Sequence, residues 1–167
     1  MALTNSELLN IDKGILQKDA FVVIVRTEWN ATIVNKLEEG CLKILHANEV
    51  TNYKIITVPG AFEILFGIKA FWNACQEGSE KPGVFIALGC VLRGGTPHFE
   101  YVCQAVTQGI VQLNLELPVP TIFGVLTLDT QEQADERTGG SHGHKGEEAA
   151  ITALKMISLR NTFPANK

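Results

Sequence analysis

Residues 84–101 read VFIALGCVLRGGTPHFEY, and this stretch predicts a strand, a glycine turn and the start of a helix. The run Val84–Leu88 is uniformly apolar and too short for a helix, which is typical of a parallel strand buried on both faces. After the glycine pair 94–95, we expect Thr96 to cap the next helix, with Pro97 in its first position. The apolar face of this helix is expected to contain Val102, Val106, Gly109, Ile110, Leu113 and Leu117.

A glycine turn between a strand and a helix can bind an anion, because free backbone N–H groups and the positive end of the helix dipole point toward it. The same residues also fit an ordinary loop before a capped helix, and the turn alone favours neither interpretation. His98 lies in the first turn of the predicted helix. It is a candidate for proton transfer, although a lone histidine at such a position is more often a plain surface residue.

Outward from this stretch, the chain alternates between short apolar runs and helical periodicity. Strands are expected at Phe21–Val25, Tyr53–Val58 and Thr121–Thr127, and helical segments follow them. A capping box at Thr130–Gln133 begins a short helix before the last one. This order predicts an α/β fold: a three-layer α/β/α sandwich with a four-stranded parallel sheet of the flavodoxin-like type.

Open parallel sheets bind their ligands beyond the carboxyl ends of the strands. The loops expected at that edge carry Trp29, Ala61–Glu63, Arg93–His98 and Thr127–Asp129. Trp29 is either a lid over the core or a platform on which a planar ligand stacks. Glu63 is either a carboxylate favoured by the helix dipole or a ligand contact. The convergence of these loops favours one shared cleft.

The totals for the chain indicate one domain with much buried surface. The 167 residues suffice for a single domain, which we place at residues 21–167 after an N-terminal arm at residues 1–20. Hydrophobic residues make up 46% and charged residues 19% of the chain, which indicates burial between subunits or around parallel strands. The net charge of -4 gives no support for binding of nucleic acid.

The cysteines, histidines and hydropathy of the chain bear on its cellular compartment and on metal and membrane binding. The four cysteines (Cys41, Cys75, Cys90 and Cys103) are scattered in apolar segments without a C-x-x-C pair, which indicates buried free thiols in a reducing compartment. His142 and His144 share a glycine loop without cysteine or carboxylate ligands nearby, so no metal is expected. Because we find no secretory signal or membrane-spanning run, we expect a cytoplasmic protein that binds no membrane.

Three motifs in this order resemble those of the 6,7-dimethyl-8-ribityllumazine synthase family. They are VPGAFE at 58–63, GGTPHFEYV at 94–102, and QADER at 133–137 followed by the pair 145–146. The Phe123-Gly124 strand fits as well, and the resemblance extends from about Phe21 to Phe163. It implies condensation of 5-amino-6-(D-ribitylamino)uracil with 3,4-dihydroxy-2-butanone 4-phosphate, with loss of phosphate and water and without a cofactor.

The resemblance also implies roles for individual residues. His98 matches the residue that transfers protons, Glu63 the carboxylate that binds the ribityl chain, and Arg137 the arginine that clamps the phosphate. The aromatic ring of Trp29 matches the stacking residue, and Lys145 a lysine near the pyrimidine. The substrate-binding positions implied in total are Trp29, Asn30, Ala61, Phe62, Glu63, Val91, Leu92, Gly95, Thr96, Phe123, Arg137 and Lys145.

In this family a neighbouring subunit completes each site, and the resemblance implies that Phe123 and Arg137 come from that neighbour. It therefore implies a homo-oligomer built of pentamers. The short spacing between Arg137 and Lys145 resembles members that assemble twelve pentamers into a 60-subunit icosahedral shell. Three features depart from the family: Gly95 replaces the usual Glu or Ala, Ser141 replaces a lysine frequent in shells, and the connection 73–83 is longer than in the shortest members.

Two other functions remain open on the sequence. A flavin- or lumazine-carrying shell could keep the same fold after losing catalysis, although the presence of His98, Arg137, Lys145 and Glu63 argues against it. A flavodoxin-like module that only binds a phosphorylated ligand rests on analogy of fold alone.

Overall fold

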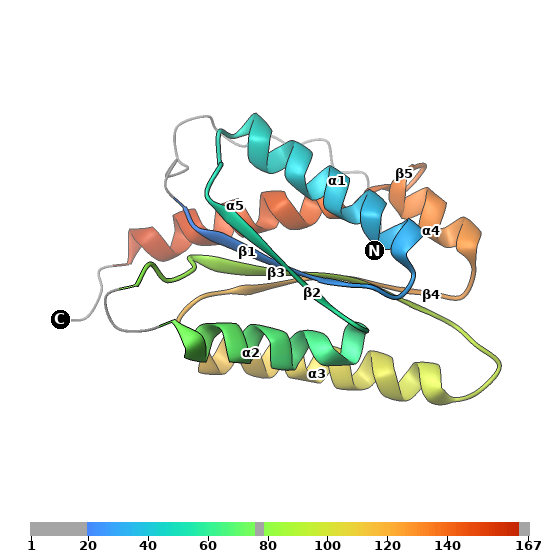
Figure 1. Ribbon diagram of the computed structural model, residues 1–167. Coiled ribbons are helices and arrows are strands. Elements are labelled where there is room, and N and C mark those ends of the chain that lie inside the picture. The colour runs from blue at the N-terminus through green and yellow to red at the C-terminus, as the bar shows by residue number, and fades with distance from the viewer. Residues whose placement is uncertain (1–19, 76–78, 164–167) are drawn as a thin grey trace.

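The computed structural model describes residues 20–75 and 79–163. Its main sheet is parallel and has four strands in the order β2-β1-β3-β4 (Figure 1). The strands are Val22–Thr27 (β1), Tyr53–Val58 (β2), Val84–Leu92 (β3) and Thr121–Leu128 (β4). The predicted fold class is therefore confirmed. The expected arm at residues 1–20 lies outside the described residues, apart from Ala20.

Helices cover both faces of this sheet and form the outer layers of the sandwich. One face carries α1 (Ala31–Ala47) and α5 (Lys145–Thr162), and the other carries α2 (Ile64–Ala74) and α3 (His98–Glu116) (Figure 1). Within residues 20–75 and 79–163, no helix is long and apolar enough to cross a membrane.

The two layers of core follow directly from the alternation of side chains along the strands. Val22 and Ile24 of β1 pack with the helices α1 and α5, whereas Val23 and Val25 pack with α2 and α3. Successive side chains of a strand point to opposite faces. An internal strand of a parallel sheet is thus covered on both faces, which explains the apolar runs that begin β1 and β3.

The strand β3 is longer than predicted. It continues past Leu88 to Leu92, because β4 offers a pairing partner at every step as far as Leu128. The helix α3 then begins at His98, and the predicted cap by Thr96 is wrong. Pro97 occupies the N-cap position with helical backbone angles and makes no side-chain capping hydrogen bond, so Thr96 lies one residue too early.

The segment after β4 contains one predicted and one unexpected feature. In α4 (Gln131–Arg137), the backbone N–H of Gln133 donates to Thr130 Oγ1 at 3.4 Å, as the capping box predicts. The reciprocal bond goes instead from the Asp129 N–H to Gln133 Oε1, at 2.8 Å. A small antiparallel hairpin follows, made of β5 (Thr138–Gly140) and β6 (Gly143–His144), which was not predicted from the sequence.

Of the predicted buried thiols, only two are fully buried. Cys41 and Cys90 lie in the core, whereas Cys75 and Cys103 are half-buried, and all four are free. Burial raises the pKa of Cys41 to about 12 and that of Cys90 to about 11. Both buried thiols therefore stay protonated at neutral pH, where they cannot act as nucleophiles.

Candidate active site

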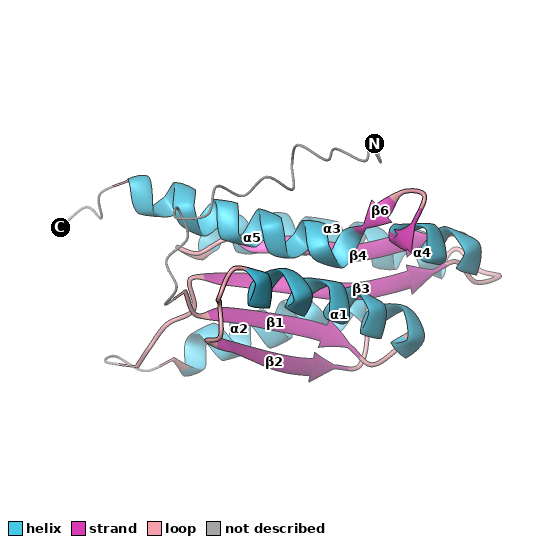
Figure 2. Ribbon diagram, turned by 90° about the horizontal axis from the view of Figure 1, so that it is seen from above, coloured by secondary structure: helices cyan, strands magenta, loops and turns pink. Residues whose placement is uncertain are grey.

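The carboxyl ends of the strands meet at one edge of the sheet, beside α4 and the β5–β6 hairpin (Figure 2). The chain leaves β1 toward β2 on one side, whereas β3 lies on the other side of β1. This reversal of strand order is the position where open parallel sheets bind ligands. The loops after β1, β2 and β3 therefore surround the expected site.

The loop after β1 is held against the loop after β2. The backbone N–H of Trp29 donates to the carbonyl of Pro59 at 3.0 Å, and the N–H of Glu28 donates to that of Val58 at 2.8 Å. The ring of Trp29 lies directly over Gly60: a Cβ atom at Gly60 would come within 2.7 Å of Trp29 Cε3. The indole nevertheless remains 65% exposed, so it is available as a stacking platform.

Asn30 links the same loop to β3. Its backbone adopts the left-handed conformation, with φ 58° and ψ 40°, at the start of α1. Its side-chain Nδ2 donates to the carbonyl of Cys90 at 2.9 Å, across the switch point between β1 and β3. The predicted substrate-binding role of Asn30 must accommodate this structural bond, which commits one N–H of the amide.

The short 3₁₀ helix Ala61–Glu63 follows β2 and places a carboxylate beside Trp29. The backbone N–H of Gly60 donates to Glu63 Oε2 at 3.1 Å, and the same oxygen would lie 3.0 Å from a Cβ atom at Gly60. Glu63 and Trp29 thus flank the same glycine. Ala61 is buried beneath them, whereas Phe62 is exposed.

The glycine turn after β3 is open to solvent. Val91 and Leu92 are half-buried at the end of the strand, whereas residues 94–98 are exposed, including His98 at the first position of α3. A Cβ atom at Gly95 would meet nothing within 4 Å, so the structure does not require glycine there. Space is therefore present around the turn and the uncapped end of α3 for an anion.

The remaining predicted residues line a groove along β4, which is an edge strand of the sheet. This groove has a volume of about 750 Å³, and Phe123, Arg137 and Lys145 contribute to its wall. Phe123 is 44% exposed. Lys145 Nζ donates to Glu148 Oε2 at 2.6 Å, and Glu148 also lines the groove.

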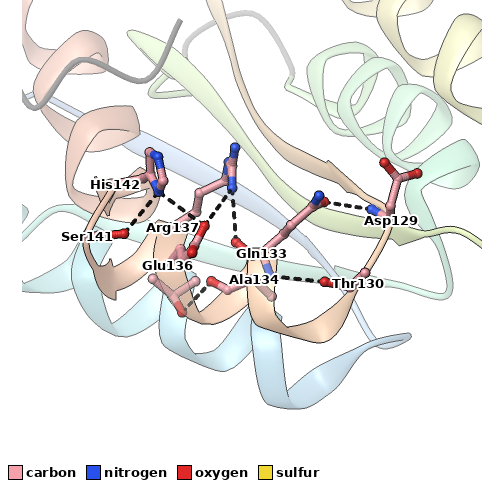
Figure 3. A network of polar contacts seen from close by, with 9 residues as sticks. Asp129, Thr130, Gln133, Ala134, Glu136, Arg137, Ser141 and His142 are labelled. Carbon is pink, nitrogen blue, oxygen red and sulfur yellow. Dashed lines mark hydrogen bonds and ion pairs between the residues drawn. The ribbon is translucent and has the colours of Figure 1, made fainter.

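Arg137 is anchored at the end of α4 by its own helix. Its Nη1 donates to the carbonyl of Gln133 at 3.3 Å and lies 3.8 Å from Glu136 Oε2 (Figure 3). Glu136 Oε2 is also 3.2 Å from His142 Nδ1, and Ser141 Oγ lies 3.1 Å from the same nitrogen. The guanidinium therefore keeps most of its donors for a ligand.

The described chain brings the predicted residues together as two groups. Trp29, Asn30, residues 61–63 and the turn after β3 occupy the strand ends, whereas Phe123, Arg137 and Lys145 occupy the groove along β4. The lining of the groove includes none of the residues in the first group.

Three charged residues hold these groups in place: Arg93 and Asp129, expected only as ends of loops at this edge, and Glu148, which was not predicted. A charged residue directly after a strand is the signal that could have identified the first two. The i,i+3 spacing from Lys145 is the signal for Glu148. No group of three His, Cys, Asp or Glu side chains able to hold a metal ion occurs within the part of the chain that the structure describes.

The fold defines a flavodoxin-like α/β protein whose candidate ligand site lies at the switch point of a parallel sheet. The chain belongs to the 6,7-dimethyl-8-ribityllumazine synthase family, whose sequence model matches residues 19–161. A 6,7-dimethyl-8-ribityllumazine synthase of Parabacteroides distasonis is 50% identical over 138 residues, which cover 81% of this chain and 83% of that protein. One of Flavobacterium psychrophilum is 43% identical over 164 residues, covering 96% and 84% respectively.

Proposed function

We propose that this chain condenses 5-amino-6-(D-ribitylamino)uracil with 3,4-dihydroxy-2-butanone 4-phosphate to give 6,7-dimethyl-8-ribityllumazine, with release of phosphate and water. The observation that carries the proposal is the meeting of Trp29 and Glu63 over Gly60 at the switch point, beside the open glycine turn. The indole can stack on a planar pyrimidine, and the carboxylate can accept hydrogen bonds from ribityl hydroxyls. The free N–H groups of the turn suit a phosphate.

Much of the acceleration comes from holding the two substrates together, since that converts a bimolecular step into a local one. Schiff-base formation, loss of phosphate and ring closure each move protons. His98 stands exposed at the start of α3 beside the turn, where its imidazole can carry these protons. Replacing His98 with alanine therefore slows turnover without abolishing it.

The second group of residues completes the site of a neighbouring subunit. The strand β4 has an unpaired edge in the described chain, and Phe123, Arg137 and Lys145 line the groove beside it. Proteins commonly protect an exposed edge strand by covering it, and we propose that a second copy covers β4 with its own glycine turn facing Arg137. A guanidinium fork together with backbone N–H groups is the arrangement that suits a phosphate leaving group.

Exposed apolar side chains support assembly through the α2–α3 layer. Phe62 and Phe66 are 56% and 78% exposed, and Tyr101, Val111 and Leu115 project from α3. A chain of this size seldom leaves so many large apolar groups in water. The proposed unit is a pentamer, and the short spacing from Arg137 to Lys145 supports a shell of twelve pentamers.

The experiment is to mix the purified protein with the two substrates and follow absorbance and fluorescence of the product. We expect lumazine to form faster than in the protein-free control, and Arg137→Ala to lose most of that acceleration. Tight binding of a flavin or lumazine without any acceleration would instead identify a ligand-carrying shell. Failure of a correctly assembled oligomer to accelerate the reaction would refute the proposed enzyme activity.

A further inference from the structure

Arg93 connects three segments at the carboxyl edge of the sheet. Its backbone N–H donates to the carbonyl of Leu128 at 2.8 Å, one step beyond the last residue pair of β3 and β4. Its side-chain Nε donates to Asp129 Oδ1 at 2.5 Å, and its Nη1 donates to the carboxylate of Glu100. The guanidinium carbon Cζ also lies 4.1 Å from the centre of the Phe99 ring.

The turn that this guanidinium spans has little else to fix it. A Cβ atom at Gly94 or Gly95 would find no neighbour within 4 Å among the described residues. Thr96 is exposed, and the N-cap residue Pro97 makes no side-chain capping hydrogen bond to α3. Arg93 contacts both of the residues that follow His98 in the helix, and these contacts hold the helix start against the end of β4.

We propose that Arg93 is a positioning residue for the reaction: it holds Phe99 and Glu100 against Asp129 and thereby fixes His98 beside the glycine turn. This inference rests on the proposed function, because His98 matters only if a proton moves there. The planar guanidinium provides a fork for two carboxylates and a face for the ring at the same time. A lysine could supply the charge but neither the fork nor the stacking surface.

The anchor at Asp129 is itself held in place. Its backbone N–H donates to Gln133 Oε1 at 2.8 Å, and the carbonyl of Gln133 accepts from Arg137 Nη1 at 3.3 Å (Figure 3). One run of polar contacts thus extends from the turn that carries His98 to the helix that carries Arg137. The hydrogen bond from Arg93 lowers the pKa of Glu100, so the carboxylate that pairs with Arg93 stays charged at neutral pH.

The test is a double-mutant cycle on assembled oligomers, with kcat and KM measured for the wild type, Arg93→Gln, His98→Ala and the double variant. We expect Arg93→Gln to lower kcat by about tenfold, as a small misplacement of a reacting group does. In the His98→Ala background the same change should cost less than about twofold, because two residues that act as a unit are not additive. Equal losses in both backgrounds would overturn the proposal.

Two further variants serve as controls for the effect of Arg93→Gln on kcat. Lys69→Gln removes a different half-exposed ion pair, between Lys69 of α2 and Glu116 of α3 at 2.8 Å, and should leave kcat unchanged. Arg93→Lys keeps the charge, and its kcat should lie between those of the wild type and Arg93→Gln. If Lys69→Gln lowers kcat as much as Arg93→Gln does, general loosening of the helices explains the effect and the proposal fails.

Amide hydrogen exchange of the peptide covering residues 94–100 gives a readout that does not depend on activity. We expect Arg93→Gln to speed exchange there by about tenfold and Lys69→Gln to leave it unchanged. Unchanged exchange in Arg93→Gln would contradict the claim that Arg93 holds the turn and the start of α3. Absence of product from the wild type would refute the proposed function instead, while exchange would still decide whether Arg93 holds the turn.

Discussion

Asn30 is constrained both by its left-handed backbone and by the hydrogen bond of its side chain. Left-handed backbone costs roughly 1 kcal/mol for residues other than glycine, although asparagine tolerates it better than most. The Nδ2 bond to the Cys90 carbonyl ties the loop after β1 to β3. An asparagine is therefore favoured here before any ligand is considered, and the position of the neighbouring Trp29 depends on it.

Substitutions at Asn30 separate the two constraints. We expect Asn30→Gly to lower the free energy of unfolding by about 1 kcal/mol, because only the hydrogen bond is lost. Asn30→Ala should cost about 2 kcal/mol, since it adds left-handed strain. Denaturant unfolding at a fixed protein concentration provides the measurement. If alanine proves no worse than glycine, backbone strain has no part in holding this loop.

The helices α1 and α5 approach closely where α5 begins. A Cβ atom at Gly146 would lie 2.0 Å from the carbonyl oxygen of Leu37, and one at Gly40 would lie 2.1 Å from the ring of His144. Backbone atoms of α1 cannot yield as a flexible side chain would. The contact thus fixes the start of α5 and, with it, Lys145 in the groove.

Gly146→Ala should therefore separate the two helices, and we expect it to lower the free energy of unfolding by about 3 kcal/mol, as overpacking of a tight contact does. Gly83→Ala is the matched control, because its nearest neighbours would lie 3.7 Å away, at ordinary contact distance. Thermal unfolding of both variants at equal concentration decides the matter. Similar melting temperatures for the two variants would show that α1 and α5 can accommodate a Cβ atom at residue 146.

The sequence predicted the elements with strong periodicity and missed those set by tertiary partners. Local sequence patterns suffice to predict some elements: apolar runs predict β1 and β3, and amphipathic periodicity predicts α3. The extension of β3 to Leu92 depends on pairing with β4, which no local pattern reveals. The β5–β6 hairpin depends on positive φ at Gly139 and Gly143, in a segment too short to show alternation.

The candidate site was predictable as a set of loops but not as contacts. Strand order alone indicates that Trp29, Glu63 and His98 gather at one edge of the sheet. The meeting of Trp29 and Glu63 over Gly60 could not be read from spacing, because it depends on how two loops fold. The same is true of Arg93, whose partners Asp129 and Glu100 come from different segments of the chain.

At the scale of the whole molecule, the proposed function places each active site between two subunits. The described chain separates the residues at its strand ends from Arg137 and Lys145 in the groove along β4. Under the proposed function, a complete site consists of the strand ends of one subunit and the groove of the next. Each subunit of a ring would contribute to two sites, one with each neighbour.

Mixing two impaired variants tests this arrangement most directly. Oligomers are formed from His98→Ala and Arg137→Ala subunits together, and their rate of lumazine formation is compared with that of each variant alone. If the site is shared, random mixing leaves about a quarter of the sites with both residues intact, and activity should rise well above the mean of the two variants. If mixed oligomers work no faster than that mean, His98 and Arg137 act within one chain, and the shared site is contradicted.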